Sequence, residues 1–413
     1  MFNKERRFIL RLCLVLAFLL PGTIVLMEPA HAVSSETPFP IATTAMGEGA
    51  LSAAFDGTNY LVGIQGDATA HYDISAQLVS QAGTLLGSRI SVSHTGGLPF
   101  VAFDGTNYLM IWQDDATDPK DQLYGVFLSK AGSIVNAPFV ISGTTISEIG
   151  GIAFGGGKYL AVFYITNLAE GKDSVYGRLV SPSGTVGDEI SISTGYGTQG
   201  FKNVAFDGAN FFVVWDNQAN NTEVKGRFVS PTGALGTEIT VKAAGLPNDN
   251  PLTVAFDGTN YLVVWTEQIN ENNWDMFGQL VTPAGAISGG VITISTASGQ
   301  QFFPLISFDG TNYLVTWTDM RNDTNWDIYG QLVSKSGALV GSEFVLNNDS
   351  GNKIGGVVGP MVDGKMLCLI DTGITVGIDG EFLFGDVYGE FLNPSRNHSP
   401  AGNILLLLEN NTQ

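Results

Sequence analysis

A phrase of eleven residues recurs along this chain at intervals of 48 to 54 residues. One intact copy, 255–265, reads Ala-Phe-Asp-Gly-Thr-Asn-Tyr-Leu-Val-Val-Trp. The second position of the phrase falls at Phe55, Phe103, Phe154, Phe206, Phe256, Phe308 and Val362. Self-similarity with a period of this length is the sequence signature of a propeller or a solenoid. We therefore expect seven copies of one structural unit.

Each copy contains four short apolar runs separated by turn residues. In the sixth copy the runs are 304–308, 313–317, 326–333 and 343–346. Asp-Gly between the first two runs predicts a tight hairpin, and aromatic and β-branched residues favour strands. Four antiparallel strands in about fifty residues make one propeller blade. The sequence predicts an all-β fold, a seven-bladed β-propeller of four-stranded antiparallel blades over 38–392.

A closed ring also requires that the last blade be joined to the first. Residues 38–44 precede the first Phe-Asp-Gly step where a fourth strand would lie, although no blade of their own precedes them. The apolar run 403–408 competes for the same edge, because it follows the last repeat at fourth-strand distance. We expect the N-terminal strand to close the ring. The tail 393–413 would then form an extra edge strand or a stub.

The first 32 residues have the pattern of an export signal. Four basic residues open the chain: Lys4, Arg6, Arg7 and Arg11. An apolar stretch, 8–27, follows, and Ala30 and Ala32 supply the small residues that a signal peptidase requires. We predict a signal peptide, 1–32, cleaved near Ala32, and a secreted or periplasmic protein with no membrane insertion after cleavage. Cleavage takes the net charge from −20 to −22, which argues against nucleic acid and anionic membranes as partners.

Sequence signatures of enzymes and metal centres are missing. The histidines beyond the export segment, His71, His94 and His398, stand in different repeats, and Cys368 lies in an apolar run that predicts a buried, inert thiol. A zinc site would need three convergent ligands. Neither Gly-x-Ser-x-Gly nor His-Glu-x-x-His occurs. No catalytic residue or cofactor is therefore assigned, and a non-enzymatic protein is favoured.

Two recurring motifs are interpreted as structural, because ring-wide repetition is what a scaffold requires. The Asp-Gly-Thr-Asn turn should build each hairpin, and the Phe before it should pack between blades. A second Asp begins the third strand, and it should hydrogen bond across the blade near the second-strand Trp. This position is held by Asp73, Asp275, Asp327 and Asp386, with Glu223 in the fourth repeat.

The second-to-third loops vary between repeats, so function is expected there. Four of them are rich in Asp, Asn or Gln: 113–121, 216–221, 267–273 and 319–325. Their oxygens suit calcium, although none follows the twelve-residue calcium-loop spacing, and with nearby Trp rings they also suit carbohydrate. The candidate ligand-binding residues are Asp114, Asp115, Asp118, Asp216, Glu267, Asn270, Trp274, Asp319, Arg321, Asp323 and Trp326.

The repeated phrase, followed by Asp-x-Tyr-Gly-Gln-Leu-Val and Ser-Pro-x-Gly, resembles repeats of secreted bacterial β-propeller proteins. The resemblance implies an exported propeller and transfers no catalytic residue. The third repeat departs from it at 155–158, and the seventh inserts 372–380. The leading hypothesis is a non-enzymatic binding protein whose partner is a glycan or an extracellular protein. The alternatives are a carbohydrate-active enzyme, either a glycoside hydrolase or a lyase, and a structural surface component.

Overall fold

The computed structural model describes most of the chain between residues 33 and 394. The described ranges are 33–44, 47–66, 73–114, 121–167, 172–193, 202–217, 223–246, 252–322, 325–376, 382–383 and 385–394. They all belong to one compact unit, His31–Arg396. The predicted export segment, the apolar run 403–408 and the candidate residues Asp115, Asp118 and Asp323 lie outside the described residues. No helix that could span a membrane is found in the described ranges.

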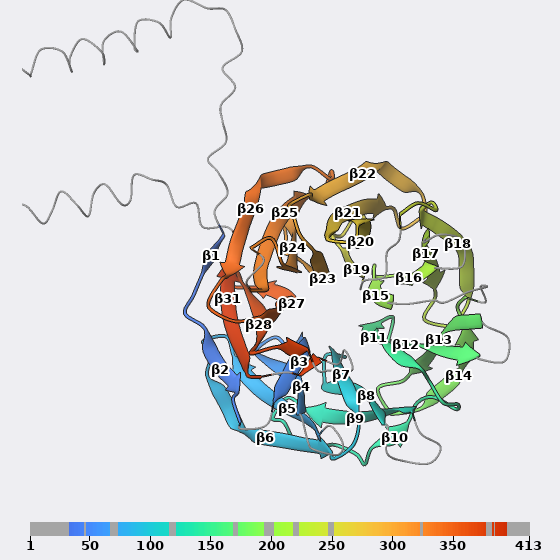
Figure 1. Ribbon diagram of the computed structural model, residues 1–413. Helices are drawn as coiled ribbons and strands as arrows, with labels where there is room; N and C mark the ends of the chain where they lie inside the picture. Colours follow the sequence, from blue (N-terminus) through green and yellow to red (C-terminus); the bar gives the residue numbers. More distant parts are fainter. Residues whose placement is uncertain are drawn as a thin grey trace, which may run out of the picture. The chain divides into compact units, whose positions relative to one another are not determined.

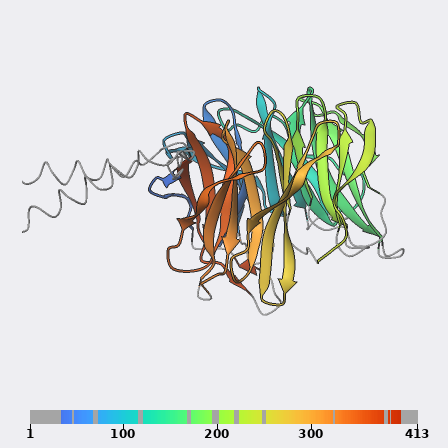
Figure 2. The same cartoon turned by 90° about the horizontal axis from the view of Figure 1, so that it is seen from above.

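The molecule is a seven-bladed β-propeller, as the repeats predict (Figure 1). The first strands of the blades surround the central axis, and Figure 2 shows the same ring turned by 90°. The first three blades are β3 (Glu48–Phe55), β4 (Asn59–Gly66), β5 (Asp73–Ser80) and β6 (Leu85–Ser93); β7 (Gly97–Phe103), β8 (Asn107–Asp114), β9 (Gln122–Ser129) and β10 (Phe139–Val140); and β11 (Glu148–Gly155), β12 (Lys158–Asn167), β13 (Lys172–Val180) and β14 (Val186–Ser191).

The remaining blades follow the same antiparallel order around the ring. The fourth to sixth are β15 (Lys202–Phe206), β16 (Phe211–Asn217), β17 (Glu223–Val229) and β18 (Leu235–Lys242); β19 (Thr253–Phe256), β20 (Tyr261–Asn270), β21 (Asn273–Val281) and β22 (Ile287–Ser295); and β23 (Gln301–Phe308), β24 (Asn312–Asp319), β25 (Asp327–Ser334) and β26 (Leu339–Asn347). The seventh contains β27 (Lys353–Val362), β28 (Lys365–Thr372) and β31 (Val387–Asn393), and a small hairpin, β29 (Thr375–Val376) and β30 (Phe382–Leu383), interrupts it.

The N-terminal strand closes the ring, as expected. Both β1 (Ser34–Ser35) and β2 (Phe39–Ala42) pair with β31 and take the fourth-strand place in the seventh blade. The Phe39 ring lies where a Cβ on Gly389 would be, and Phe344 of the sixth blade covers Gly330 in the same way. The glycine of the third strand therefore provides space for the fourth-strand ring, and β2 packs like the fourth strand of an internal repeat.

The Asp-Gly-Thr-Asn motif forms the first hairpin of a blade, which confirms its structural interpretation. In the sixth blade one Asp309 carboxylate oxygen accepts hydrogen bonds from the backbone N–H groups of Thr311 and Asn312 at 2.7 and 2.6 Å. Gly310 has a φ of 92°, which a side chain would strain. The preceding Phe308 packs against a core cluster that joins the fifth and sixth blades. The expected packing of this Phe between blades is therefore correct.

A tyrosine ties most hairpins to the following blade. The Tyr313 hydroxyl donates to the Asn260 carbonyl of the preceding blade at 2.6 Å. Burial, reinforced by Asp257, raises the pKa of the Tyr313 phenol far above its ordinary value, so the phenol remains a donor. The same bond joins Tyr108 to Asn59, Tyr159 to Asn107 and Tyr261 to Asn210. The irregular third repeat has Gly155 in place of the Asp, and the fourth blade has Phe211 at the position of the tyrosine. The hydroxyl donor of the tie is therefore missing there.

We expect Tyr313→Phe to lower the free energy of unfolding by about 1 kcal/mol, because it removes the side-chain donor from the Asn260 carbonyl, which keeps the Asp257 backbone N–H as its other donor. Phe211→Tyr should not lower the free energy of unfolding in the same way, because the Phe211 ring has no hydroxyl whose hydrogen bond could be lost. Urea denaturation of both variants measures the difference. Equal effects of the two substitutions would contradict the role assigned to the tie.

Candidate functional site

The second-to-third connections lie on one face of the ring, because every blade is the same antiparallel meander. On this face the start of the first strand, the end of the second and the start of the third come together. In the sixth blade Gln301 pairs with Asp319, and Asp319 pairs with Asp327. In the fifth blade Glu267 pairs with Asp275. The structure therefore brings together the candidate residues of the fifth and sixth blades in two similar arrangements.

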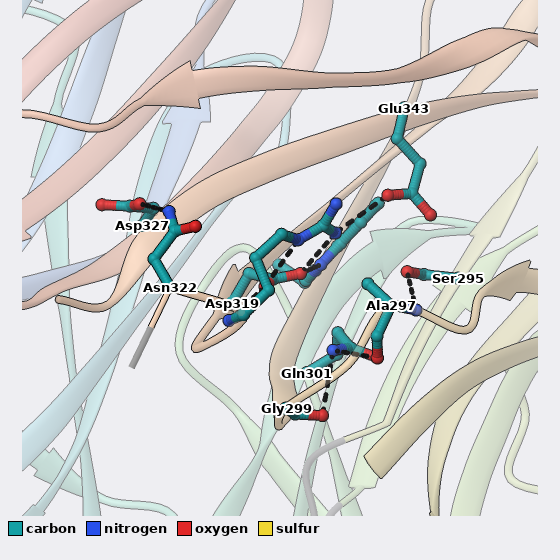
Figure 3. A network of polar contacts seen from close by, with 10 residues as sticks. Ser295, Ala297, Gly299, Gln301, Asp319, Asn322, Asp327 and Glu343 are labelled. Atoms are coloured by element: carbon teal, nitrogen blue, oxygen red, sulfur yellow. Dashed lines mark hydrogen bonds and ion pairs between the residues drawn. The ribbon is translucent and has the colours of Figure 1, made fainter. Parts of the chain in front are cut away.

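Asp319 is the centre of the sixth-blade network (Figure 3). Its side chain is buried and accepts a hydrogen bond from the Trp317 indole at 2.8 Å. The guanidinium of Arg321 donates to both carboxylate oxygens, at 2.8 and 2.6 Å, and the Arg321 backbone N–H donates at 2.9 Å. Trp317 and Asp319 are two residues apart on one strand, so their side chains lie on the same face. Asp319 thus holds the loop rather than facing solvent.

Two cations neutralise the carboxylates that face each other across this blade, where like charges would repel. Arg321 also donates to Glu343 at 2.8 Å, and its guanidinium lies 3.8 Å from the centroid of the Tyr329 ring. The Lys353 amine lies 3.6 Å from Asp327 and is almost fully buried. Burial lowers the pKa of Lys353, and Asp327 opposes this effect. Both cations are therefore committed to internal partners.

The loop before β23 is held by Gln301 (Figure 3). The Gln301 side chain is fully buried, and its amide donates to the carbonyls of Ala297 and Gly299, each at 3.1 Å. The Met320 backbone N–H donates to the Gln300 carbonyl at 2.9 Å. These bonds fix the start of the first strand against the loop that carries Arg321.

The fifth blade repeats this arrangement with one difference. The Trp265 indole donates to Glu267 at 2.8 Å, and Lys242 of the fourth blade lies 3.4 Å from the same oxygen. Asp275 accepts a hydrogen bond from the Asn273 amide at 2.8 Å. Burial raises the pKa of Asp275, and Glu267 adds to the effect while the Asn273 bond opposes it. The two acids of this blade therefore differ in environment.

The third-strand Asp was expected to bond near the second-strand Trp, and the structure corrects the partner. The indole N–H groups of Trp265 and Trp317 donate to the acid two residues further along their own strand. Asp275 instead binds the Asn273 amide, and Asp327 binds the amide of Asn322 at 2.8 Å. Residues two apart on a strand share a face, so the indole finds its acceptor without crossing to the next strand.

The predicted binding residues divide into an inward and an outward group. Asp114, Asp216 and Asp319 are buried, with 5 %, 0 % and 1 % of their surface exposed. Asn270 is exposed, and the side chains of Glu267, Trp274, Arg321 and Trp326 are partly exposed. Among the described residues the loop surface of these two blades thus presents indoles, amides and the carboxylates of Glu267 and Glu271, while Asp319 and Asp327 face inward.

Several residues of this region were missed by sequence reasoning. Lys242 and Lys353 neutralise the acids, and Phe302 and Phe303 add rings beside Trp326. Lys242 ends β18 and Lys353 begins β27, and both positions are next to acid-rich loops. A lysine at such a position could have been predicted to pair with the loop acids. Phe302 and Phe303 directly precede the predicted first strand, 304–308, and were not singled out.

Metal ligation finds no support in the part of the chain that the structure describes. There, no three His, Cys, Asp or Glu side chains come together in a way that would hold a metal ion. No described residue is therefore assigned as a calcium ligand.

Comparisons with known proteins support the fold class. No family model matches the chain, and no curated protein matches it. Polysaccharide lyase Uly1 has a similar structure, with a TM-score of 0.52 and 11 % identity over 91 % of this chain and 94 % of its own. A neuraminidase-like protein from A/bat/Guatemala/164/2009 gives a TM-score of 0.48 at 12 % identity, covering 90 % and 97 % of the two chains. An acylaminoacyl peptidase of Pyrococcus horikoshii gives 0.48 at 9 % identity, covering 87 % of this chain and 54 % of its own. Identities this low indicate shared architecture alone.

Proposed function

We propose that this protein is an exported, non-enzymatic binding propeller that recognises a glycan through the loops of its fifth and sixth blades. The observation that carries the proposal is the division of polar groups on this face. The carboxylates of Asp319 and Asp327 point inward onto Trp317, Arg321 and Lys353, while Asn270 and partly exposed indoles point outward. Amides bind sugar hydroxyls in fixed directions, and indole faces cover the C–H face of a pyranose ring.

Binding is tested with an array of neutral and acidic oligosaccharides, followed by calorimetry on the best ligand. We expect Trp274→Ala and Asn270→Ala each to weaken binding at least fivefold, about 1 kcal/mol. Leu339→Ala is the control, because Leu339 is exposed on the outer strand β26 and pairs with Val333, at the end of the blade opposite the loops. Tight binding of an extracellular protein with no glycan bound would refute the glycan and leave a protein as the partner.

A carbohydrate-active enzyme is the second candidate, favoured by the acid pair of the fifth blade. Glycoside cleavage uses one carboxyl group as an acid and another as a base or nucleophile, and environments that separate their pKa values suit these roles. Glu267 is paired with Lys242, whereas burial raises the pKa of Asp275. Polysaccharide turnover that disappears in Glu267→Gln would establish the enzyme. A protein that neither binds nor cleaves glycans would fit a structural surface component.

A further inference from the structure

Phe303 has a backbone conformation that a bulky residue rarely adopts. Its φ is 52°, and Pro304 follows it, which further restricts the backbone. The other described non-glycine residues with positive φ are Asp121 and Asp363, whose short polar side chains tolerate this region better. The pairing of β23 with β24 is irregular between Phe302 and Leu305. A glycine would fit this position with less strain, so the ring itself needs a reason.

Phe303 belongs to a group of three rings, here called the aromatic corner: Phe302, Phe303 and Trp326. The centroids of Phe302 and Phe303 are 5.0 Å apart with the rings at 70°, and those of Phe302 and Trp326 are 5.4 Å apart at 88°. Phe302 is buried in the middle, whereas Phe303 and Trp326 remain partly exposed. The corner therefore presents two rings supported from behind by a third.

The backbone around the aromatic corner is fixed. The Trp326 N–H donates to the Asn352 side chain at 3.2 Å, and the Lys353 N–H donates to the Trp326 carbonyl at 3.1 Å. Gln301 secures the residues before Phe302 through the carbonyls of Ala297 and Gly299. Strain of this kind persists where the surroundings determine the conformation, and it gathers at ligand-binding positions.

The charges beside the aromatic corner favour an uncharged ligand. Arg321 donates to Asp319 and Glu343 and covers the Tyr329 ring. Lys353 is buried and donates to the Gly351 carbonyl at 2.8 Å besides approaching Asp327. Neither cation has its charge available for a carboxylate or sulfate group, and the chain carries a net charge of −20. An acidic sugar would meet repulsion here without a compensating partner.

We propose that the aromatic corner binds one face of a neutral hexopyranose unit. The Phe303 ring makes the main contact, and the strained backbone at Phe303 holds that ring in position. This inference rests on the proposed glycan-binding function and specifies its ligand class and its contact residue. Pyranose rings without charged substituents present a face of C–H groups that packs on an aromatic ring, as apolar ligand surfaces do.

The test compares four variants of the full-length chain by calorimetry with cello-, galacto- and manno-oligosaccharides and with uronic and sulfated oligosaccharides. Phe303→Gly and Phe303→Ala should each weaken binding at least tenfold, Phe303→Tyr should retain it, and Leu339→Ala should leave it unchanged. Thermal unfolding supplies a readout that does not depend on the ligand. Phe303→Gly should melt above Phe303→Ala, the reverse of their usual order in a strand, because only glycine relieves the positive φ.

Each outcome separates this inference from the proposed function. Glycan binding that survives Phe303→Ala overturns the aromatic corner but keeps the glycan-binding propeller. Binding only to uronic or sulfated glycans overturns the neutral ligand class. Phe303→Gly melting at or below Phe303→Ala removes the strain argument. If the protein binds none of the oligosaccharides, both this inference and the proposed glycan-binding function are wrong.

Discussion

Asp319→Ala is expected to lower the free energy of unfolding by about 3 to 5 kcal/mol, because it removes one partner of a buried, hydrogen-bonded ion pair. The substitution leaves the Trp317 indole N–H and the Arg321 backbone N–H without their acceptor. It also leaves the guanidinium of Arg321 paired with Glu343. Denaturant unfolding followed by tryptophan fluorescence measures the change.

The matched control is Glu343→Gln, which alters the other carboxylate of Arg321. Glu343 is more exposed than Asp319, so its loss should change stability by less than about 1 kcal/mol. If both variants were equally stable, Asp319 would not anchor the loop. Glycan binding by Asp319→Ala has to be measured well below the melting temperature of the variant. Asp319 lies on β24, which pairs with the β23 strand that carries Phe302 and Phe303, so partial unfolding would also disturb the aromatic corner.

Glu390→Gln is expected to stabilise the protein by about 3 kcal/mol at pH 8 and to have little effect near pH 4. Glu390 is buried on β31, at the position that Gln331 holds in the sixth blade. The Gln331 amide donates to the Leu332 and Val340 carbonyls at 2.9 and 3.1 Å. A glutamine at 390 would supply such a donor without an ionisable group.

The direction of the pH effect follows from the carboxyl group of Glu390. Burial, assisted by Asp349, raises its pKa to about 7, while hydrogen bonds to Ser35 and Asn347 oppose the rise. The ordinary value is 4.5, so the native state holds a proton that the unfolded state releases. Stability therefore falls as pH rises from about 4.5 to about 7, and the full penalty remains above that range.

Melting curves of wild type and Glu390→Gln between pH 4 and 8 test this prediction. Burial also raises the pKa of Asp371, but that contribution is common to both proteins and cancels in the difference. The matched control is Gln331→Glu, which should introduce the same pH-dependent penalty into the sixth blade. Parallel curves for wild type and Glu390→Gln would show that Glu390 does not titrate as described.

The architecture was predictable because it depends on repeated local features. The period, the Asp-Gly turns and the strand composition each recur, so errors in one copy are corrected by the others. The place of the N-terminal strand was also predictable, because residues 38–44 have the position of a fourth strand but no preceding blade of their own. The replacement of the tyrosine by Phe211 was also visible in the repeats, although only the structure shows that the hydroxyl at this position joins two blades.

The site was less predictable, because it depends on whether each side chain of a loop or strand end points into the blade or toward solvent. Composition placed Asp319 in an acidic rim, whereas its spacing from Trp317 turns it inward. Lys353 belongs to the next blade in sequence but neutralises Asp327. The positive φ of Phe303 has no signal in an apolar run, since the same letters fit an ordinary strand.

Closure by the N-terminal strand sets the order in which the molecule can be completed. Ser34 pairs with Asn393, and Phe39 pairs with Gly389. During synthesis β2 leaves the ribosome long before β31 is made. The strand β2 therefore stays unpaired while the other blades form. Contacts this distant in sequence form slowly. A chain that stops before β31 leaves the apolar side chains of Phe39 and Ile41 without their partners, and the ring therefore distinguishes a finished chain from an incomplete one.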